Sequence, residues 1–223
     1  MIRVHVLVEG ETEVTFVKQV LLPHFTSYGI HLLPRQLGRT RHKRGICTYP
    51  LAQREILITL KHEAQTFCTT MFDYYGMPPD WPQRKEARDR PFAERSIMIE
   101  NAISTDISSR LGSRFNCSRF IPYVQMHEFE ALLFSDPKVL ADGLGLADDG
   151  PIRHITDQFQ SPEEINDSQQ TAPSKRIAGL NAKYSKVTHG TLISQTIGLN
   201  VMRAQCPHFN EWIAKLEALG RGG

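Results

Sequence analysis

The sequence predicts an α/β fold: a parallel, Rossmann-like sheet flanked by helices, with a small helical extension at the C-terminal end. Two observations support this prediction. Short runs rich in Val, Ile, Leu and Phe alternate with longer segments whose apolar positions recur every three or four residues. Such alternation is typical of βαβ units, in which helices cover both faces of a parallel sheet. Beyond about residue 137 the chain changes to short helices and polar loops. We therefore expect residues 1–136 to form the α/β core and residues 137–223 to form a mainly helical extension packed on that core.

The expected elements begin with residues 2–8, an apolar run that ends at an acid, as a buried parallel strand often does. A helix follows from Glu11 or Thr12 to about residue 28. Further elements are expected at residues 30–36 (strand), 51–64 (helix), 66–73 (strand), 91–110 (helix) and 119–125 (strand). Pro122 places the last strand at an edge of the sheet, since proline cannot donate to a strand ladder.

Composition sets limits on the class of protein. The chain has 223 residues, and its 26 basic and 24 acidic side chains leave a net charge of only +2. Global charge therefore does not identify a partner, and a nucleic-acid signal has to come from local clusters. No run approaches the 18 apolar residues of a membrane span. The first residues lack the features of a secretion signal, so we expect a cytoplasmic protein.

Acidic residues follow three of the predicted strands. The carboxyl ends of parallel strands meet at one edge of a sheet, where functional groups gather. Carboxylates brought together there repel one another unless a cation neutralises them, and oxygen ligands suit Mg²⁺ or Mn²⁺. Taken singly, each acid has a simpler interpretation as a helix start, a cap or a surface residue. Together they predict a shared metal site formed by Glu9, Glu13, Asp73, Glu128 and Glu130.

An apolar strand followed by Val8-Glu9-Gly10-x-Thr12-Glu13 resembles the first motif of the TOPRIM fold. Topoisomerases, primases, recombination proteins and the overcoming-lysogenization-defect (OLD) nucleases share that fold. The wider pattern is similar to a bacterial family of stand-alone TOPRIM-like proteins, and the similarity spans nearly the whole chain. Its segments are residues 8–13, 73–78, 127–134, 173–177, 197–199 and 206–209.

The resemblance implies roles for individual acids. Glu9 takes the place of the TOPRIM glutamate, a general acid/base or metal ligand, and Asp73 takes the place of the first acid of an Asp-x-Asp motif. The second acid is absent, because position 75 is Tyr. OLD nucleases draw further acids from the first helix and from a later Glu-x-Glu pair. The resemblance therefore indicates nuclease-like chemistry rather than DNA relaxation, or a degenerate site.

Cleavage of a phosphodiester by two metal ions requires ligands for both. We expect Glu9, Glu13 and Asp73 to hold one Mg²⁺ or Mn²⁺ ion. Glu128 and Glu130 are expected to help hold a second. A cation near the phosphate is also needed, and Lys175 is the candidate catalytic cation, with Arg176 beside it. The alternative for both basic residues is a plain position on a helix surface.

A basic cluster between Arg35 and Arg44 is the other local signal. Glycines flank its densest part, which favours a loop. Such a cluster can neutralise several phosphates and give sequence-independent, salt-sensitive binding. A solvated charged loop is the simpler alternative. The predicted nucleic-acid-binding residues are Arg35, Arg39, Arg41, Lys43, Arg44 and Arg176.

These observations favour a Mg²⁺-dependent nuclease or phosphotransfer enzyme that acts on nucleic acid, with a role in phage defence. The alternative is a TOPRIM-like partner of a separate ABC-type ATPase, with a degenerate or regulated site. The ATPase would have to be another chain, because this one has no Walker A motif. A hydrolase of small phosphate esters is a third class, and a homodimer is left open.

Overall fold

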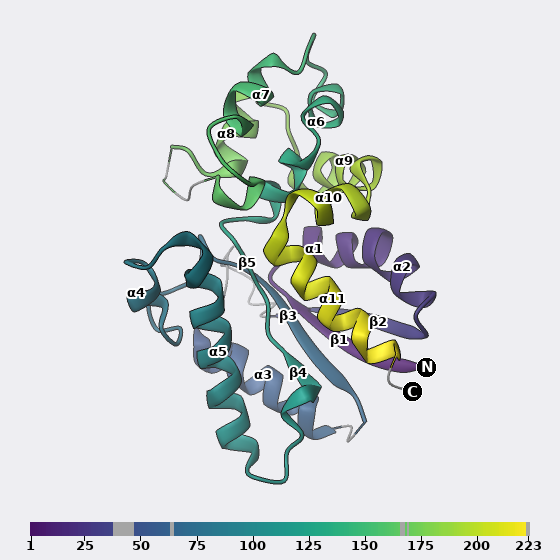
Figure 1. Cartoon of the computed structure of the whole chain (residues 1–223), viewed down its shortest axis with the longest axis vertical. Helices are drawn as coiled ribbons and strands as arrows, with labels where there is room; N and C mark the ends of the chain where they lie inside the picture. The colour runs from purple at the N-terminus through teal and green to yellow at the C-terminus, as the bar shows by residue number, and fades with distance from the viewer. Residues whose placement is uncertain (38–46, 63–64, 166–167, 169, 222–223) are drawn as a thin grey trace.

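The computed structural model describes residues 1–37, 47–62, 65–165, 168 and 170–221. Within these residues the core is a five-stranded sheet in the order β2-β1-β3-β4, with the short β5 also paired to β3. Every strand pair is parallel, as the sequence predicts (Figure 1). The strands are β1 (Ile2–Val8), β2 (Ile30–Gln36), β3 (Phe67–Asp73), β4 (Phe120–Ile121) and β5 (Val124–Gln125).

Strand β1 contributes to two hydrophobic clusters, one on each face of the sheet. Val4, Val6 and Val8 belong to the first cluster, and Leu7 belongs to the second. Successive side chains of a strand point to opposite faces, so Val4, Val6 and Val8 bury one face, and Leu7 buries the carboxyl end of the other. A strand of this kind lies inside the sheet, and β1 is indeed flanked by β2 and β3.

One face of the sheet is covered by helices from both ends of the chain (Figure 1). After β1 the chain forms α1 (Glu11–Phe16), a π-helical segment (Val17–Leu21) and α2 (Leu22–Thr26). Beside them lies the C-terminal helix α11 (Pro207–Arg221). The indole nitrogen of Trp212 in α11 donates to Oγ1 of Thr69 in β3 over 2.8 Å. The C-terminal helix is thus part of the layer that covers the sheet.

The opposite face is covered by α3 (Tyr49–His62) and α5 (Phe92–Leu111), with the short α4 (Arg84–Ala87) beside α5 (Figure 1). Ile56, Ile99 and Ile103 pack there against Leu7 of β1.

The other helices gather beyond the carboxyl ends of the strands, at the top of Figure 1. The hydrophobic cluster beside α1 continues into them without a break at residue 136. Their bounds are η3 (Phe129–Ser135), α6 (Pro137–Gly143), α7 (Gly150–Thr156), η4 (Pro162–Glu164), α8 (Pro173–Leu180), η5 (Lys186–Gly190), α9 (Thr191–Ile197) and α10 (Leu199–Gln205). The short η2 (Cys117–Arg119) lies elsewhere, directly before β4.

Two details differ from the sequence prediction. The expected strand at 119–125 consists of two short strands, β4 and β5, with Pro122 between them. Proline removes a ladder donor, which interrupts the pairing with β3. Helix α3 begins at Tyr49 rather than at residue 51. None of the described helices is long and apolar enough to cross a membrane.

Candidate functional site

The first part of the site is the turn from β1 into α1. Gly10 lies in an extended conformation just before α1, and the side chain of Glu13 folds back over it. A Cβ atom at position 10 would lie 3.0 Å from Oε2 of Glu13, so a larger residue would press on that carboxylate. Glu13 is 3% exposed, whereas Glu11 points to solvent. Of the two acids in the first turn of α1, only Glu13 therefore faces inward.

Asp73, at the end of β3, connects this turn to the rest of the site. Its backbone N–H donates to Oε1 of Glu9 over 2.5 Å. Its own Oδ1 accepts from the backbone N–H of Phe129 over 3.0 Å. Parallel pairing of β1 with β3 places the two strand ends side by side. The sheet register thus brings Glu9 and Asp73 together.

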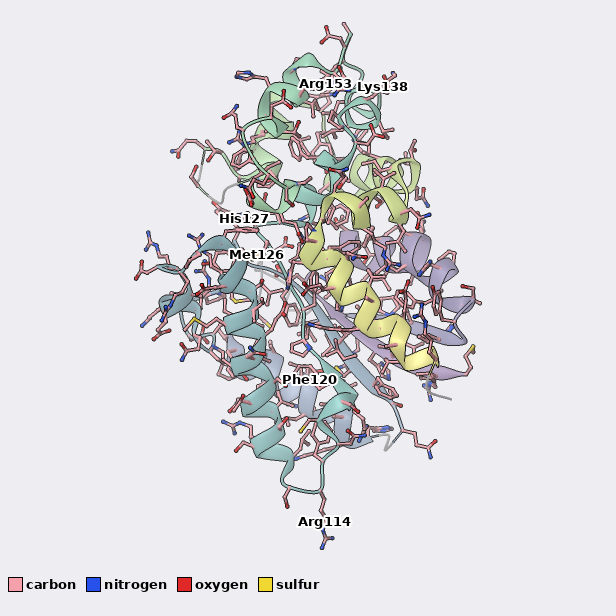
Figure 2. All side chains as sticks on the ribbon, viewed as in Figure 1. Arg114, Phe120, Met126, His127, Lys138 and Arg153 are labelled. Carbon is pink, nitrogen blue, oxygen red and sulfur yellow. The ribbon has the colours of Figure 1, made fainter. Side chains whose placement is uncertain are left out.

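The third segment leaves β5 through His127, which has a positive φ of 60°. Few residues other than glycine adopt this conformation, and it turns the chain sharply into η3. The His127 ring packs near the rings of Tyr74 and Phe92 (His127 is labelled in Figure 2). The turn delivers Glu128 and Glu130 to the same end of the sheet, as the sequence predicts.

Lys186 is the cation at the middle of this site, and sequence reasoning missed it. Its Nζ lies 3.1 Å from Oε2 of Glu130. It also lies 3.5 Å from Oε1 of Glu13 and 3.5 Å from Oδ2 of Asp73. We call the four carboxylates of Glu9, Glu13, Asp73 and Glu130, together with Lys186, the acidic centre.

Glu130 is the most enclosed member of the acidic centre. Its side chain is 1% exposed. Neither carboxylate oxygen has a well-aligned hydrogen bond in the described part of the chain, and its contact with Lys186 is an ion pair. Burial raises the pKa of this carboxyl, and Lys186 opposes that rise. A buried carboxylate with so few partners is costly to the native state. It is therefore a candidate ligand for a further cation or an ordered water.

The charges of the acidic centre shift one another's ionisation. Burial raises the pKa of Glu9 well above its ordinary value, and the nearby charges of Asp73 and Glu13 raise it further. The pKa of Asp73 is also raised well above its usual range, mainly by burial and against the attraction of Lys186. Burial acts to lower the pKa of Lys186, but the facing carboxylates outweigh it and the pKa is raised. Perturbed groups of this kind concentrate at functional sites.

Glu128 has a different environment from the four acids of the centre. Its carboxylate accepts from the backbone N–H of Ser174 over 2.9 Å and from the Ser174 hydroxyl over 3.0 Å. Ser174 lies in the first turn of α8, so the acid satisfies a helix N-terminus. Glu128 therefore anchors α8 beside the acidic centre.

The predicted cation Lys175 is exposed on α8. No ion pair joins it to the acidic centre among the residues that the structure describes, where Lys186 holds that position. The Arg176 side chain donates to the backbone oxygen of Thr171 over 2.7 Å and lies over the ring of Phe159.

The predicted basic cluster is seen only at its first member. Arg35 lies on β2, is paired with Glu55 over 3.2 Å and donates to the Thr59 hydroxyl over 2.9 Å. Its contacts hold β2 to α3. The remaining members, Arg39, Arg41, Lys43 and Arg44, lie outside the described residues.

The acidic centre is not a preformed metal site. Within the described residues, no group of three or more His, Cys, Asp or Glu side chains is already arranged around a metal-sized space. The Lys186 ammonium instead lies between the carboxylates. A divalent ion would have to displace that ammonium and draw the carboxylates inward.

Together these features define a parallel α/β protein with an acidic centre at the carboxyl ends of its strands. The model of the family described as "Domain of unknown function (DUF4276)" matches residues 8–217, nearly the whole chain. The chain belongs to the DUF4276 family. The comparisons with curated proteins and with solved structures gave no match.

Proposed function

We propose that this protein is a divalent-metal-dependent phosphodiesterase that cleaves nucleic acid. The observation that carries the proposal is the convergence of acids from three separate segments: Glu13, Asp73 and Glu130 all contact the Lys186 ammonium, and Glu9 accepts from the backbone N–H of Asp73. Local sequence cannot make such a convergence, because the sheet has to bring together strand ends far apart in the chain. An excess of buried negative charge at this position calls for a cation.

The residues present fit Mg²⁺ or Mn²⁺ by their chemistry. All the donors are carboxylate oxygens, which hard divalent cations prefer, and Glu130 offers two oxygens with no well-aligned hydrogen bond. Glu9, Glu13, Asp73 and Glu130 would hold one such ion. A second ion would need Glu128 as well, which first has to release Ser174. A bound ion would supply charge stabilisation for the phosphate and an activated water.

Two side chains have further roles in this proposal. Burial and the nearby carboxylates raise the pKa of Glu9, so it binds a proton more tightly than an ordinary glutamate and, when it is not bound to the ion, could exchange that proton with a reacting group. Lys186, displaced from the carboxylates, remains charged and can pair with a phosphate oxygen. Its side chain is 36% exposed, which leaves room for that movement. Lys186 thus replaces Lys175 as the proposed catalytic cation.

A second function is favoured by the same lysine. If Lys186 stays between the carboxylates, its ammonium takes the place of a metal ion and the site is not catalytic. The protein would then serve as a TOPRIM-like partner of a separate ATPase. The resemblance to TOPRIM proteins that work beside ABC-type ATPases supports this alternative, and a role in phage defence accords with either function.

The test of catalysis compares the purified protein with the Glu9→Ala and Asp73→Ala variants. Each is incubated with single- and double-stranded DNA, RNA and tRNA in Mg²⁺ or Mn²⁺. Asp142→Ala is the matched control, because Asp142 is an exposed acid whose one ion pair within the described residues is with Lys138. We expect cleavage to fall about 100-fold or more in the two site variants and to persist in the control. Equal cleavage by all four proteins would mean that a contaminant acts, and absence of cleavage by the wild type would favour the partner function.

A further inference from the structure

A second site lies next to the acidic centre and has the opposite charge. It is a pocket of about 540 Å³, half open to solvent, formed where the loop after β3 meets α4 and the start of α5. Figure 1 shows α4 on the left, beside the upper part of α5. The walls combine basic and aromatic side chains: Tyr74, Tyr75, Arg84, Lys85, Arg88 and Arg95.

The lining of this basic pocket carries no acid among the described residues. Lys85 and Arg88 are exposed, and neither side chain has an ion-pair or hydrogen-bond partner in the described part of the chain. Arg95 donates its Nε to the backbone oxygen of Arg90 over 2.9 Å, which leaves its charge uncompensated. Three acids do occur nearby in sequence, but none of them lines the pocket: Glu86, Asp89 and Glu94.

The pocket has a rigid wall. The guanidinium of Arg84 lies 3.8 Å from the centre of the Tyr74 ring. It also donates to the Tyr74 hydroxyl over 3.0 Å and to the Tyr74 backbone oxygen over 3.3 Å. Behind this wall Trp81 is buried and donates to the backbone oxygen of Cys47. These contacts fix Arg84 and the backbone of α4 against the loop, so the helix that carries Lys85 and Arg88 is positioned before any ligand arrives.

The pocket and the acidic centre are joined by two residues of backbone. Tyr74 and Tyr75 directly follow Asp73, so the Cα atoms of Asp73 and Tyr75 are at most about 7.6 Å apart. Both tyrosine N–H groups donate to the segment that carries the other acids, to the backbone oxygens of Gln125 and His127. A chain of phosphates with one member at the acidic centre would have its next member near the pocket.

We propose that this basic pocket binds the phosphate of a nucleic-acid strand adjacent to the phosphodiester held at the acidic centre. Lys85, Arg88 and Arg95 would pair with the phosphate, and the half-buried Tyr75 would support the attached base. A volume of this size suits one nucleotide. The inference rests on the proposed function, because it assumes that the acidic centre receives a phosphodiester.

The test measures binding of a fluorescently labelled single-stranded oligonucleotide by anisotropy in EDTA, at several salt concentrations. The variant Lys85→Gln/Arg88→Gln is compared with Lys61→Gln/Arg114→Gln. The control pair also loses one Lys and one Arg, and both residues are exposed. Arg114 lies at the bottom tip of the molecule in Figure 2, beyond the end of α5 that is far from the pocket. We expect the pocket variant to bind at least about tenfold more weakly, with a salt slope lower by about two, while the control changes little.

Competitors identify the ligand. A mononucleotide, inorganic phosphate and an acidic peptide are each added to the complex with the oligonucleotide. We expect unlabelled oligonucleotide to displace the labelled strand at a lower concentration than any of these three competitors. Equal competition by mononucleotide or phosphate would assign the pocket to a small phosphate ester, and stronger competition by the peptide would assign it to a protein partner. Either outcome would overturn the proposal, as would equal binding by the two double variants.

The pocket and the catalytic proposal can fail separately. Glu9→Ala should bind the oligonucleotide in EDTA as the wild type does, because the basic pocket is intact. Binding that depends on Lys85 and Arg88 without any cleavage by the wild type would retain the pocket and reject the nuclease. If the pocket variant still cleaves nucleic acid and binds the oligonucleotide with unchanged affinity, the nuclease is retained and the pocket is rejected.

Discussion

Two buried charge clusters of this protein have opposite balances. At Glu217 of α11, one carboxylate is held by two side chains: the ring of His24 at 2.7 Å and Arg203, whose guanidinium contacts both carboxylate oxygens. At the acidic centre, one ammonium is shared by several carboxylates. Burial acts to raise the pKa of Glu217, but hydrogen bonds from Arg203 and His24 lower it. The pKa values of Glu9, Asp73 and Glu130 are raised instead.

The Glu217 cluster is an ion pair that holds helices together, whereas the acidic centre has more acids than cations. The Glu217 cluster joins α2, α10 and α11, and its charges are matched. The acidic centre keeps an excess of negative charge that the fold alone does not neutralise. Such an arrangement destabilises the native state and persists where function requires it.

The largest effect is expected from removal of the shared cation. Lys186→Met leaves the carboxylates without their counter-charge and should lower the free energy of unfolding in EDTA by about 2 kcal/mol, a value reduced from that of a fully buried pair because the side chain is partly exposed. Mg²⁺ should restore much of this loss. Thermal or denaturant unfolding with and without Mg²⁺ measures both. A variant as stable as the wild type, with no response to Mg²⁺, would count against the acidic centre as a cation site.

Substitution of one acid in each cluster should change stability in opposite directions. Glu217→Gln leaves Arg203 without its carboxylate and should destabilise the protein by about 1–2 kcal/mol. The loss is limited because Arg203 and His24 are partly exposed and can be hydrated. Glu130→Gln removes an unmatched charge and should stabilise the metal-free protein by about 1 kcal/mol at neutral pH. Chemical denaturation in EDTA compares them. Destabilisation by both would show that the two clusters are equivalent.

The pH dependence should show the same difference. Between the ordinary carboxyl pKa of about 4 and the raised values of Glu9, Asp73 and Glu130, the native state binds more protons than the unfolded state. These groups therefore lower stability as the pH rises through that window. Mg²⁺ competes with the same protons, so its stabilising effect should grow with pH, by about 1 kcal/mol between pH of about 5.5 and about 8.

Thermal unfolding at the two pH values, with EDTA or excess Mg²⁺, tests this dependence. Asp73→Asn should abolish the Mg²⁺ effect, whereas Glu217→Gln should leave it. The lowered pKa of Glu217 gives the opposite dependence, since its contribution is lost as the pH falls through that lowered value. A Mg²⁺ effect that is the same at both pH values would contradict the assignment.

The smallest effect is expected at Ser174. Ser174→Ala removes the hydroxyl that donates to Glu128 but keeps the backbone donor, so the loss of stability should be about 1 kcal/mol or less. The released carboxylate oxygen should strengthen Mn²⁺ binding slightly if Glu128 is a ligand. Calorimetric titration of the variant with Mn²⁺ measures this. Weaker binding would instead show that Ser174 positions the site.

Local sequence patterns were enough to predict β1, β2 and β3 to within one residue, because each strand begins with or contains several apolar residues and is bounded by turn or polar segments. The same runs placed Glu9 and Asp73 at neighbouring strand ends. Lys186 had no such signal. It lies more than fifty residues after Glu130, in a short π-helical turn, and only the packing of that turn against η3 and α1 brings its ammonium to the acids.

The environments of two other predicted residues also depend on long-range packing. The sequence predicts the same role, metal ligand, for Glu128 and Glu130. In the structure Glu128 contacts α8, whereas Glu130 is enclosed beside Lys186. The C-terminal helix was expected in an extension of the core. That extension was expected to pack on the core, and the helix lies directly on the sheet, held by the contact between Trp212 and Thr69. Helical periodicity identifies a buried face but not the surface that covers it.

The most direct test is a crystal of the protein soaked in Mn²⁺ and measured for anomalous scattering. We predict a peak at the acidic centre, among the carboxylates of Glu9, Asp73 and Glu130, with the Lys186 ammonium displaced from its present position. Electron density in which Lys186 still lies between the carboxylates, with no anomalous peak beside them, would contradict a metal-dependent function.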